Sequence, residues 1–148
     1  IGYSLNNTSD YFKLKKYMVP DQVQIPYNFF DQEFFEKKIQ NLLKIDKTKV
    51  HVRSIFLQGI LLNNNLKNIK MKLTMSKIKN LCKLKNIKLI DACINFILKN
   101  KNIDKVVVGV NDINELKEIL NYKKKRLNLN FLNKIALNKK YIKPYLWR

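Results

Sequence analysis

Short apolar runs alternate along this chain with longer segments in which apolar residues recur every three or four positions. The first pattern is typical of strands and the second of amphipathic helices. The pattern predicts strands at residues 1–4, 23–25, 50–55 and 106–108. It predicts helices at residues 10–18, 31–45 and 112–122, two or three helices near 66–73, 75–85 and 89–100, and a weakly amphipathic segment at 127–137.

The stretch VHVRSIFLQGILL, residues 50–62, begins as a strand and continues as a long loop that turns at Gly59. A loop of this length in a compact domain is more often functional than idle. Polar groups at a strand end beside a glycine are where α/β proteins place binding chemistry. The run Val106–Val108 predicts a strand buried on both faces, and Asp112 followed by Glu115 predicts a helix N-cap with a capping box.

Strand–helix units of this kind predict a parallel sheet with right-handed crossovers. Four units in about 120 residues fit either a small doubly wound sheet or half of a (β/α)8 barrel. A glycine-rich phosphate-binding motif would favour the doubly wound sheet. With only Gly2, Gly59 and Gly109, the chain has neither a GxGxxG motif nor a P-loop.

The net charge of +19 invites a nucleic-acid interpretation, but only Arg53, Arg126 and Arg148 among the 30 basic residues are arginine. Specific phosphate and base recognition favours arginine, and the lysines are scattered as an AT-rich genome would scatter them. The basic run at residues 123–126 follows a predicted helix, and cations near the C-terminus of a helix interact favourably with the helix dipole. Nucleic acid is therefore not the expected partner, although a binding module for nucleic acid or an anionic polysaccharide remains an alternative.

No apolar run approaches the roughly 18 residues that a membrane span needs, and no signal peptide is visible. Cys82 and Cys93 lack metal-ligand spacing, so buried, reduced thiols in a cytoplasmic protein are expected, with no metal site. His51, inside a strand, and Tyr17 are expected to pack, as are five aromatic residues after the second strand: Tyr27, Phe29, Phe30, Phe34 and Phe35. Because the chain opens within a strand at Ile1, we expect a fragment.

Four stretches resemble, in order, the last four strands of aldo/keto reductases, in the branch often found beside sugar and surface-polysaccharide genes. IGYSLN (1–6) is similar to the fifth strand, usually GVSN, and VQIPYNFFD (23–31) to the sixth. RSIFLQGILL (53–62) is similar to the seventh, commonly YSPLxxGLLTG. VVVGVNDINELKEIL (106–120) is similar to the eighth and its helix, commonly IPGxRxxEQLxEN. The resemblance implies that residues 1–148 form the C-terminal half of a (β/α)8 TIM barrel, strands five to eight.

The resemblance implies an oxidoreductase that uses NADPH or NADH. Ser4 and Gln24 would bind the nicotinamide carboxamide, Arg53 would stand where an aromatic residue stacks on the nicotinamide, and Ser54 and Leu57 would contact the pyrophosphate and ribose. The remaining implied cofactor residues are Gly59 beside the phosphates and, at the adenosine end, Gly109, Asn111 and Glu115.

Several positions depart from the family pattern. Leu5 replaces an asparagine that contacts the carboxamide, and Ile119 replaces one that contacts adenine. An acidic pair, Asp112 and Glu115, stands near the expected 2′-phosphate position, where it disfavours a further negative charge. The departures therefore favour NADH over NADPH.

The family's catalytic Asp, Tyr, Lys and His come from earlier strands, so no catalytic residue is assigned here. We expect the full-length parent to reduce a small, possibly sugar-like carbonyl compound by hydride transfer, with this chain as the cofactor-binding half and an N-terminal half of the same barrel as its partner. Alone, the chain is expected to be inactive and either poorly soluble or self-associating, because its outer strands have unpaired edges. The alternative is a non-catalytic remnant or pseudoenzyme.

Overall fold

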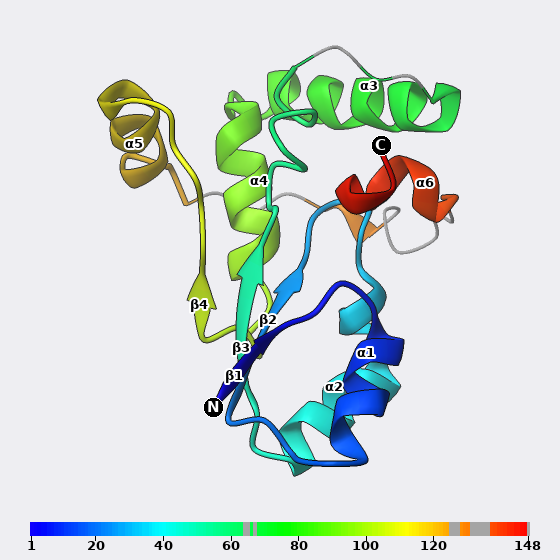
Figure 1. The fold of residues 1–148 in the computed structure, drawn as a ribbon. Helices are drawn as coiled ribbons and strands as arrows, with labels where there is room; N and C mark the ends of the chain where they lie inside the picture. Colours follow the sequence, from blue (N-terminus) through cyan, green and yellow to red (C-terminus); the bar gives the residue numbers. More distant parts are fainter. Residues whose placement is uncertain (64–65, 67, 125–127, 131–136, 148) are drawn as a thin grey trace.

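The computed structural model describes residues 1–63, 66, 68–124, 128–130 and 137–147. Its centre is a sheet of four parallel strands in the order β1-β2-β3-β4 (Figure 1). The strands are β1 (Gly2–Ser4), β2 (Gln22–Pro26), β3 (Lys49–Arg53) and β4 (Lys105–Val106). Spatial order follows chain order, which is the arrangement predicted for successive strand–helix units.

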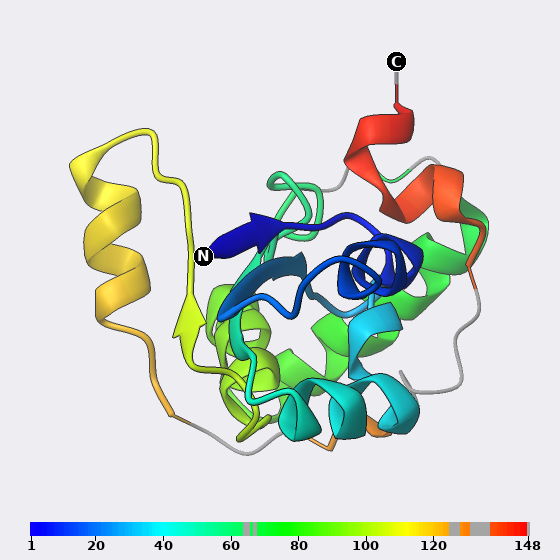
Figure 2. The ribbon, with the colours of Figure 1, turned by 60° about the horizontal axis from the view of Figure 1, so that its bottom comes forward.

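Helical segments follow each strand. They are α1 (Thr8–Lys15), η1 (Glu33–Phe35), α2 (Lys37–Ile45), α3 (Ile69–Leu84), α4 (Leu89–Leu98), α5 (Ile113–Leu120), α6 (Lys139–Ile142) and η3 (Pro144–Leu146). Of these, α1, α2 and α4 pack against one side of the sheet. Figure 2 shows α5 standing beyond β4, apart from the other helices. None of its residues is buried.

The two faces of the sheet differ in chemistry because residues alternate along each strand. On one face Val23, Ile25, Val50 and Val52 are each at most 3% exposed and pack in a core with side chains from α1, α2 and α4. The other face carries two rows of register partners, Gly2–Gln22–Lys49 and Ser4–Gln24–His51–Lys105. Its polar side chains are half-buried or exposed. The sheet therefore has one apolar, covered face and one polar, open face.

A second core cluster holds the loop after β3 against α3 and α4. Leu57 and Leu61 are fully buried there beside Met75 and Ile78 of α3. The prediction of buried free thiols is confirmed for Cys82 and Cys93, which also lie in this cluster. The predicted packing of the aromatic residues is confirmed as well, because Tyr27, Phe29, Phe30 and Phe34 are buried and Phe35 stacks on Tyr27.

Some predicted element boundaries were wrong. The helix expected at residues 31–45 is split, because Glu36 adopts an extended conformation between η1 and α2. Of the two or three helices expected over residues 66–100, the structure has α3 and α4, because the segments at 66–73 and 75–85 form one continuous helix. Thr74 and Met75 are buried within it. Helix α1 starts earlier than predicted, with a capping box between Asn7 and Asp10.

Two burial predictions also failed. Val106–Val108 is not buried on both faces, since β4 pairs only with β3 among the described strands and Val107 is 41% exposed. Tyr17 follows α1 and is 89% exposed, so it does not pack. Most of the amphipathic segment predicted at 127–137 lies outside the described residues. Among the helices that the structure describes, none is both long and apolar enough to cross a membrane.

Candidate functional site

The structure brings Ser4 and Gln24 together at the carboxyl end of the sheet. Their Cα atoms are register partners on β1 and β2, and the Leu5 N–H donates to the Gln24 carbonyl oxygen at 2.9 Å. Since register partners on neighbouring parallel strands point to the same face, both side chains belong to the polar face. His51, the partner of Gln24 on β3, is half-buried on this face rather than in the core.

Arg53 ends β3 and reaches across to the segment after β1. Its Nη2 donates to Asn6 Oδ1 at 2.6 Å and to the Leu5 carbonyl oxygen at 3.3 Å, and its Nη1 donates to Ser54 Oγ at 3.3 Å. Burial lowers the pKa of the Arg53 guanidinium, while the negative charge of Asp31 opposes that shift. The guanidinium is thus held in place by neutral oxygens at the strand ends.

The loop after β3 winds tightly, with four residues in the left-handed region. Ser54, Leu57, Gln58 and Gly59 have φ angles of 58°, 48°, 52° and 78°. A Cβ added to Gly59 would meet only Asn63 Nδ2, at 3.7 Å, so the backbone angle rather than crowding favours glycine. Leu57 is fully buried, its N–H donates to the Ser54 carbonyl oxygen at 2.9 Å and its carbonyl oxygen accepts from the Ile60 N–H at 3.1 Å, so it presents no accessible group to a ligand.

Asn28, which sequence analysis did not single out, supports this loop. It is 1% exposed, and its Nδ2 donates to the Ser54 carbonyl oxygen at 3.1 Å. Its Oδ1 accepts from the backbone N–H groups of Phe30 and Asp31, both at 3.0 Å. One amide side chain therefore ties the turn after β2 to the turn after β3.

A polar pocket of about 320 Å³ lies over these strand ends. It contains three residues of the β3 end, Arg53, Ser54 and Gln58, two of which were predicted site residues. The C-terminal segment supplies another wall, although it lies far away in the sequence. The lining residues are Asn6, Pro26, Arg53, Ser54, Gln58, Lys143, Pro144 and Tyr145.

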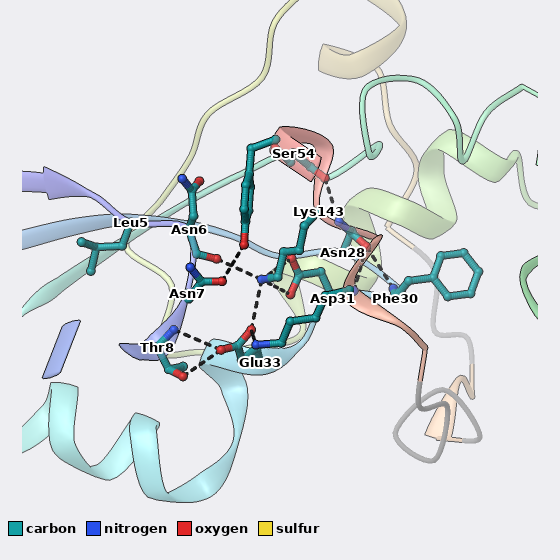
Figure 3. Close-up of polar contacts among 12 residues, drawn as sticks. Leu5, Asn6, Asn7, Thr8, Asn28, Phe30, Asp31, Glu33, Ser54 and Lys143 are labelled. Carbon is teal, nitrogen blue, oxygen red and sulfur yellow. Dashed lines mark hydrogen bonds and ion pairs between the residues drawn. The ribbon is translucent and has the colours of Figure 1, made fainter. Parts of the chain in front are cut away.

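Lys143 anchors that C-terminal wall and was missed by sequence analysis. Its Nζ lies 2.9 Å from Asp31 Oδ2 and 3.2 Å from Glu33 Oε2, and donates to the Asn6 carbonyl oxygen at 3.0 Å (Figure 3). The hydroxyl of Tyr145, two residues later, donates to Asn7 Oδ1 at 2.7 Å. No local pattern marks Lys143, because it is one lysine in a lysine-rich chain.

The two carboxylates beside Lys143 have pKa values shifted in opposite directions. Burial raises the pKa of Asp31, and the attraction of Lys143 offsets only part of that effect. Burial would also raise the pKa of Glu33, but hydrogen bonds from the Thr8 hydroxyl and N–H and the charge of Lys143 prevail and lower it to about 2. Glu33 is thus the firmly ionised partner of the cluster.

The connection from β4 to α5 and the start of α5 carry the remaining predicted site residues, Gly109, Asn111 and Glu115. Asp112 caps α5 as predicted, accepting at Oδ1 from the N–H groups of Asn114 and Glu115. The Glu115 carboxylate accepts from the N–H and Nδ2 of Asn111 rather than from the cap itself. Gly109 has open space where a Cβ would be. Among the described residues, no hydrogen bond or ion pair joins this group to Arg53 or Ser54.

Among the residues that the structure describes, no three His, Cys, Asp or Glu side chains gather as they would around a metal ion. The arrangement instead offers a polar sheet face, a glycine-containing loop and a pocket with cationic and neutral donors. Such groups suit the binding of polar organic ligands.

Comparisons with known proteins show the family of the chain. A model of the aldo/keto reductase family matches residues 1–137. Among solved structures, the chain is similar to a thermostable aldo-keto reductase crystallised with the inhibitor epalrestat, with a TM-score of 0.55 and 16% identity. The match covers 76% of this chain and 38% of that reductase, so the chain spans well under half of its length. No curated protein matches the chain.

Proposed function

The chain belongs to the aldo/keto reductase family, and we propose that it forms strands five to eight of a (β/α)8 barrel that reduces a small carbonyl compound with NADPH or NADH. The observation that carries this proposal is the two-faced parallel sheet. Its apolar face is covered by helices and its polar face is open, which is the arrangement of barrel strands whose inner face meets other strands. Free, buried Cys82 and Cys93 suit a cytoplasmic protein.

The polar face fits the nicotinamide end of the cofactor. Ser4 and Gln24 lie on neighbouring strands with their side chains on one face, so a hydroxyl and an amide can both reach a planar carboxamide. The Leu5 side chain offers the cofactor no polar contact, because it is apolar and lies in the core, where the residue is 6% exposed. When bound, the cofactor supplies a hydride; the residues here bind and orient it.

The remaining cofactor residues follow the loops. Ser54 and Gly59 would hold the pyrophosphate and ribose, with Gly109, Asn111 and Glu115 at the adenosine end, whereas the fully buried Leu57 would not reach the cofactor. The Glu115 carboxylate repels a 2′-phosphate, which supports NADH over NADPH. Arg53 would lie beside the nicotinamide, where its planar guanidinium can stack.

The proposed catalytic groups lie outside this chain, which we assign no catalytic residue. The partner is an N-terminal half of the same barrel, carrying the acid that protonates the carbonyl oxygen. The described sheet supports this partner because the outer edges of β1 and β4 are unpaired and the polar face is uncovered.

Binding of NADH to the chain tests the proposal, followed by energy transfer from Trp147, the single tryptophan. Gln24→Leu should weaken binding by about tenfold, as expected for loss of a hydrogen bond or two. Gln22→Leu is the matched control, since Gln22 lies two residues earlier on β2 and on the same face of the sheet. Equal affinity of the Gln24 and Gln22 variants would contradict the assignment.

A non-catalytic remnant or basic binding module is the second candidate. The buried Leu5 favours a remnant, and the cationic residues Lys49, Arg53 and Lys105 on the open face favour anion binding. Titration of an anionic polysaccharide at rising salt separates these candidates from a reductase. Tight binding that falls steeply with salt, without NADH binding, would favour the module.

A further inference from the structure

Helix α3 carries large apolar residues on its outward face as well as on its inward face. The inward face is buried through Met71, Thr74, Met75, Ile78 and Cys82. On the outward face, Ile69, Leu73 and Leu84 are 65%, 60% and 80% exposed. Their spacing places them within about 60° of helical rotation, so they form one stripe about 22 Å long. The exposed polar residues Ser76 and Asn80 lie between them.

Lysines border this stripe on both sides. At about 100° per residue, two exposed lysines lie on one side of it and two on the other: Lys72 and Lys83, and Lys70 and Lys77. None of the described ion pairs involves these four side chains. The sequence has no aspartate or glutamate between Asp46 and Asp91. The outward face of α3 is therefore apolar along its centre and positively charged along both borders.

Helix α5 shows that this combination is not a general result of the lysine-rich composition. Ile113 and Leu120 of α5 are 58% and 71% exposed, close to the values for α3. The charges of α5 are mixed, however, because Lys117 lies between Glu115 and Glu118. Single exposed apolar residues are ordinary on protein surfaces, whereas a stripe bordered only by cations indicates a partner that is both apolar and anionic.

A bilayer that contains anionic lipids has this chemistry. Apolar side chains of a surface-lying helix enter the boundary between headgroups and acyl chains, and the lysines beside them reach the anionic headgroups. Nucleic acid would engage the lysines but would leave the apolar stripe in water. Figure 1 shows α3 at the end of the molecule towards which the strands point, where its exposed face is directed away from the sheet.

We propose that the outward face of α3 binds the surface of an anionic lipid bilayer. Ile69, Leu73 and Leu84 insert among the headgroups, and the bordering lysines pair with the lipid anions. This surface is separate from the open face of the sheet and from the proposed cofactor residues, so the inference does not depend on the reductase assignment. Attachment of this kind is reversible and weakens as salt rises.

Vesicle flotation tests the proposal, because bound chain rises with the lipid whereas self-associated chain sinks. The chain should float with phosphatidylcholine vesicles that contain phosphatidylserine, and should remain below with phosphatidylcholine alone. Ile69→Gln/Leu73→Gln should weaken binding by about tenfold or more, because two inserted apolar side chains are lost. Ile113→Gln/Leu120→Gln on α5 is the matched control and should change binding by no more than about twofold.

A second pair of variants tests the charged borders. Lys72→Gln/Lys83→Gln should weaken binding by about tenfold or more, since each lysine near an anionic surface strengthens binding by about fivefold. Lys37→Gln/Lys38→Gln on α2 removes the same charge elsewhere and should weaken binding clearly less. All of the substituted side chains are exposed, so the circular dichroism spectrum should stay that of the wild type.

Three outcomes would overturn the proposal. They are absence of flotation with phosphatidylserine vesicles, equal weakening by the apolar variants of α3 and α5, and equal weakening by the lysine variants of α3 and α2. Binding of a DNA duplex that needs the α3 lysines but not Ile69 and Leu73, without flotation, would assign the face to nucleic acid instead. NADH binding through Gln24 is measured separately, so either result leaves the reductase assignment standing.

Discussion

Lys143 and Asp31 form an ion pair in which each side chain is 1% exposed, although 112 residues separate them in the sequence. The pair joins the segment between α6 and η3 to the loop after β2, and the bond from Lys143 to Asn6 adds the segment after β1. The C-terminal wall of the pocket is therefore fixed by buried charge.

Removal of Lys143 should be strongly destabilising. Lys143→Met leaves the buried Asp31 carboxylate without its counterion, so the free energy of unfolding should fall by about 3–5 kcal/mol. Urea unfolding at neutral pH measures this change. The double variant Lys143→Met/Asp31→Asn should regain part of the loss because no unpaired buried charge remains.

Lys139→Met is the matched control for that experiment. Its ammonium lies 3.3 Å from Glu33 but the side chain is 58% exposed, so the loss should stay below about 1 kcal/mol. Similar losses of unfolding free energy for the Lys139 and Lys143 variants would show that the buried ion pair contributes no more to stability than the exposed one.

Acid should weaken the fold through Glu33. Its pKa in the folded chain is about 2, below its ordinary value of 4.5. The stabilising contribution of Glu33 is therefore complete above pH 4.5 and is lost as the pH falls toward 2. Asp31 acts in the opposite sense, because its raised pKa makes the folded chain hold that proton more tightly and gain stability at acid pH.

Glu33→Gln isolates this effect. The substitution should lower the free energy of unfolding by about 1–3 kcal/mol near pH 6 and by clearly less near pH 3, measured by urea unfolding. Glu36→Gln, at an exposed neighbouring carboxylate, should leave the pH profile of the wild type unchanged. A Glu33→Gln effect that is the same at both pH values would contradict the assignment.

Tyr11 should stabilise the opposite end of the sheet. Its hydroxyl donates to Asp46 Oδ2 at 2.7 Å, and its side chain is 0% exposed. Tyr11→Phe should cost about 1–2 kcal/mol of unfolding free energy, because buried acceptors lose a donor. Tyr17→Phe, at a side chain that is 89% exposed, should have no measurable effect in the same thermal or urea unfolding experiment.

The isolated chain should self-associate and should not reduce carbonyl compounds. Unpaired edges at β1 and β4 invite strand addition. Sedimentation at several concentrations should show oligomers, and Val107→Lys beside the β4 edge should reduce them more than Val110→Lys does. The two valines are similarly exposed, at 41% and 40%. A monodisperse monomer that reduces a carbonyl with NADH would contradict this prediction.

Local sequence patterns were sufficient where local forces decide the structure. Short apolar runs located the strands, and Asp112 was recognised as a helix cap because capping depends on neighbours two and three residues away. The adjacency of Ser4 and Gln24 followed from the family resemblance and is present in the sheet register. Their role in cofactor binding stays a prediction.

Long-range forces explain what the patterns missed. Lys143 gives no local sign of burial, because its partners Asp31 and Glu33 are more than a hundred residues away and tertiary packing alone brings them together. The pattern left open whether residues 66–85 form one helix or two, and α3 continues through Thr74, which is buried. The pocket escaped prediction for the same reason, since one of its walls comes from the C-terminal segment.

The uneven packing across the sheet implies that the chain opens in stages. Strands β2 and β3 share a core in which Val23, Ile25 and Val52 are fully buried, whereas α5 has no buried residue. Amide protons of α5 should therefore exchange with deuterated solvent through local fluctuations, while those of β2 and β3 should wait for global unfolding. The end of the domain that carries Asn111 and Glu115 would then be the first to exchange and the last to become ordered.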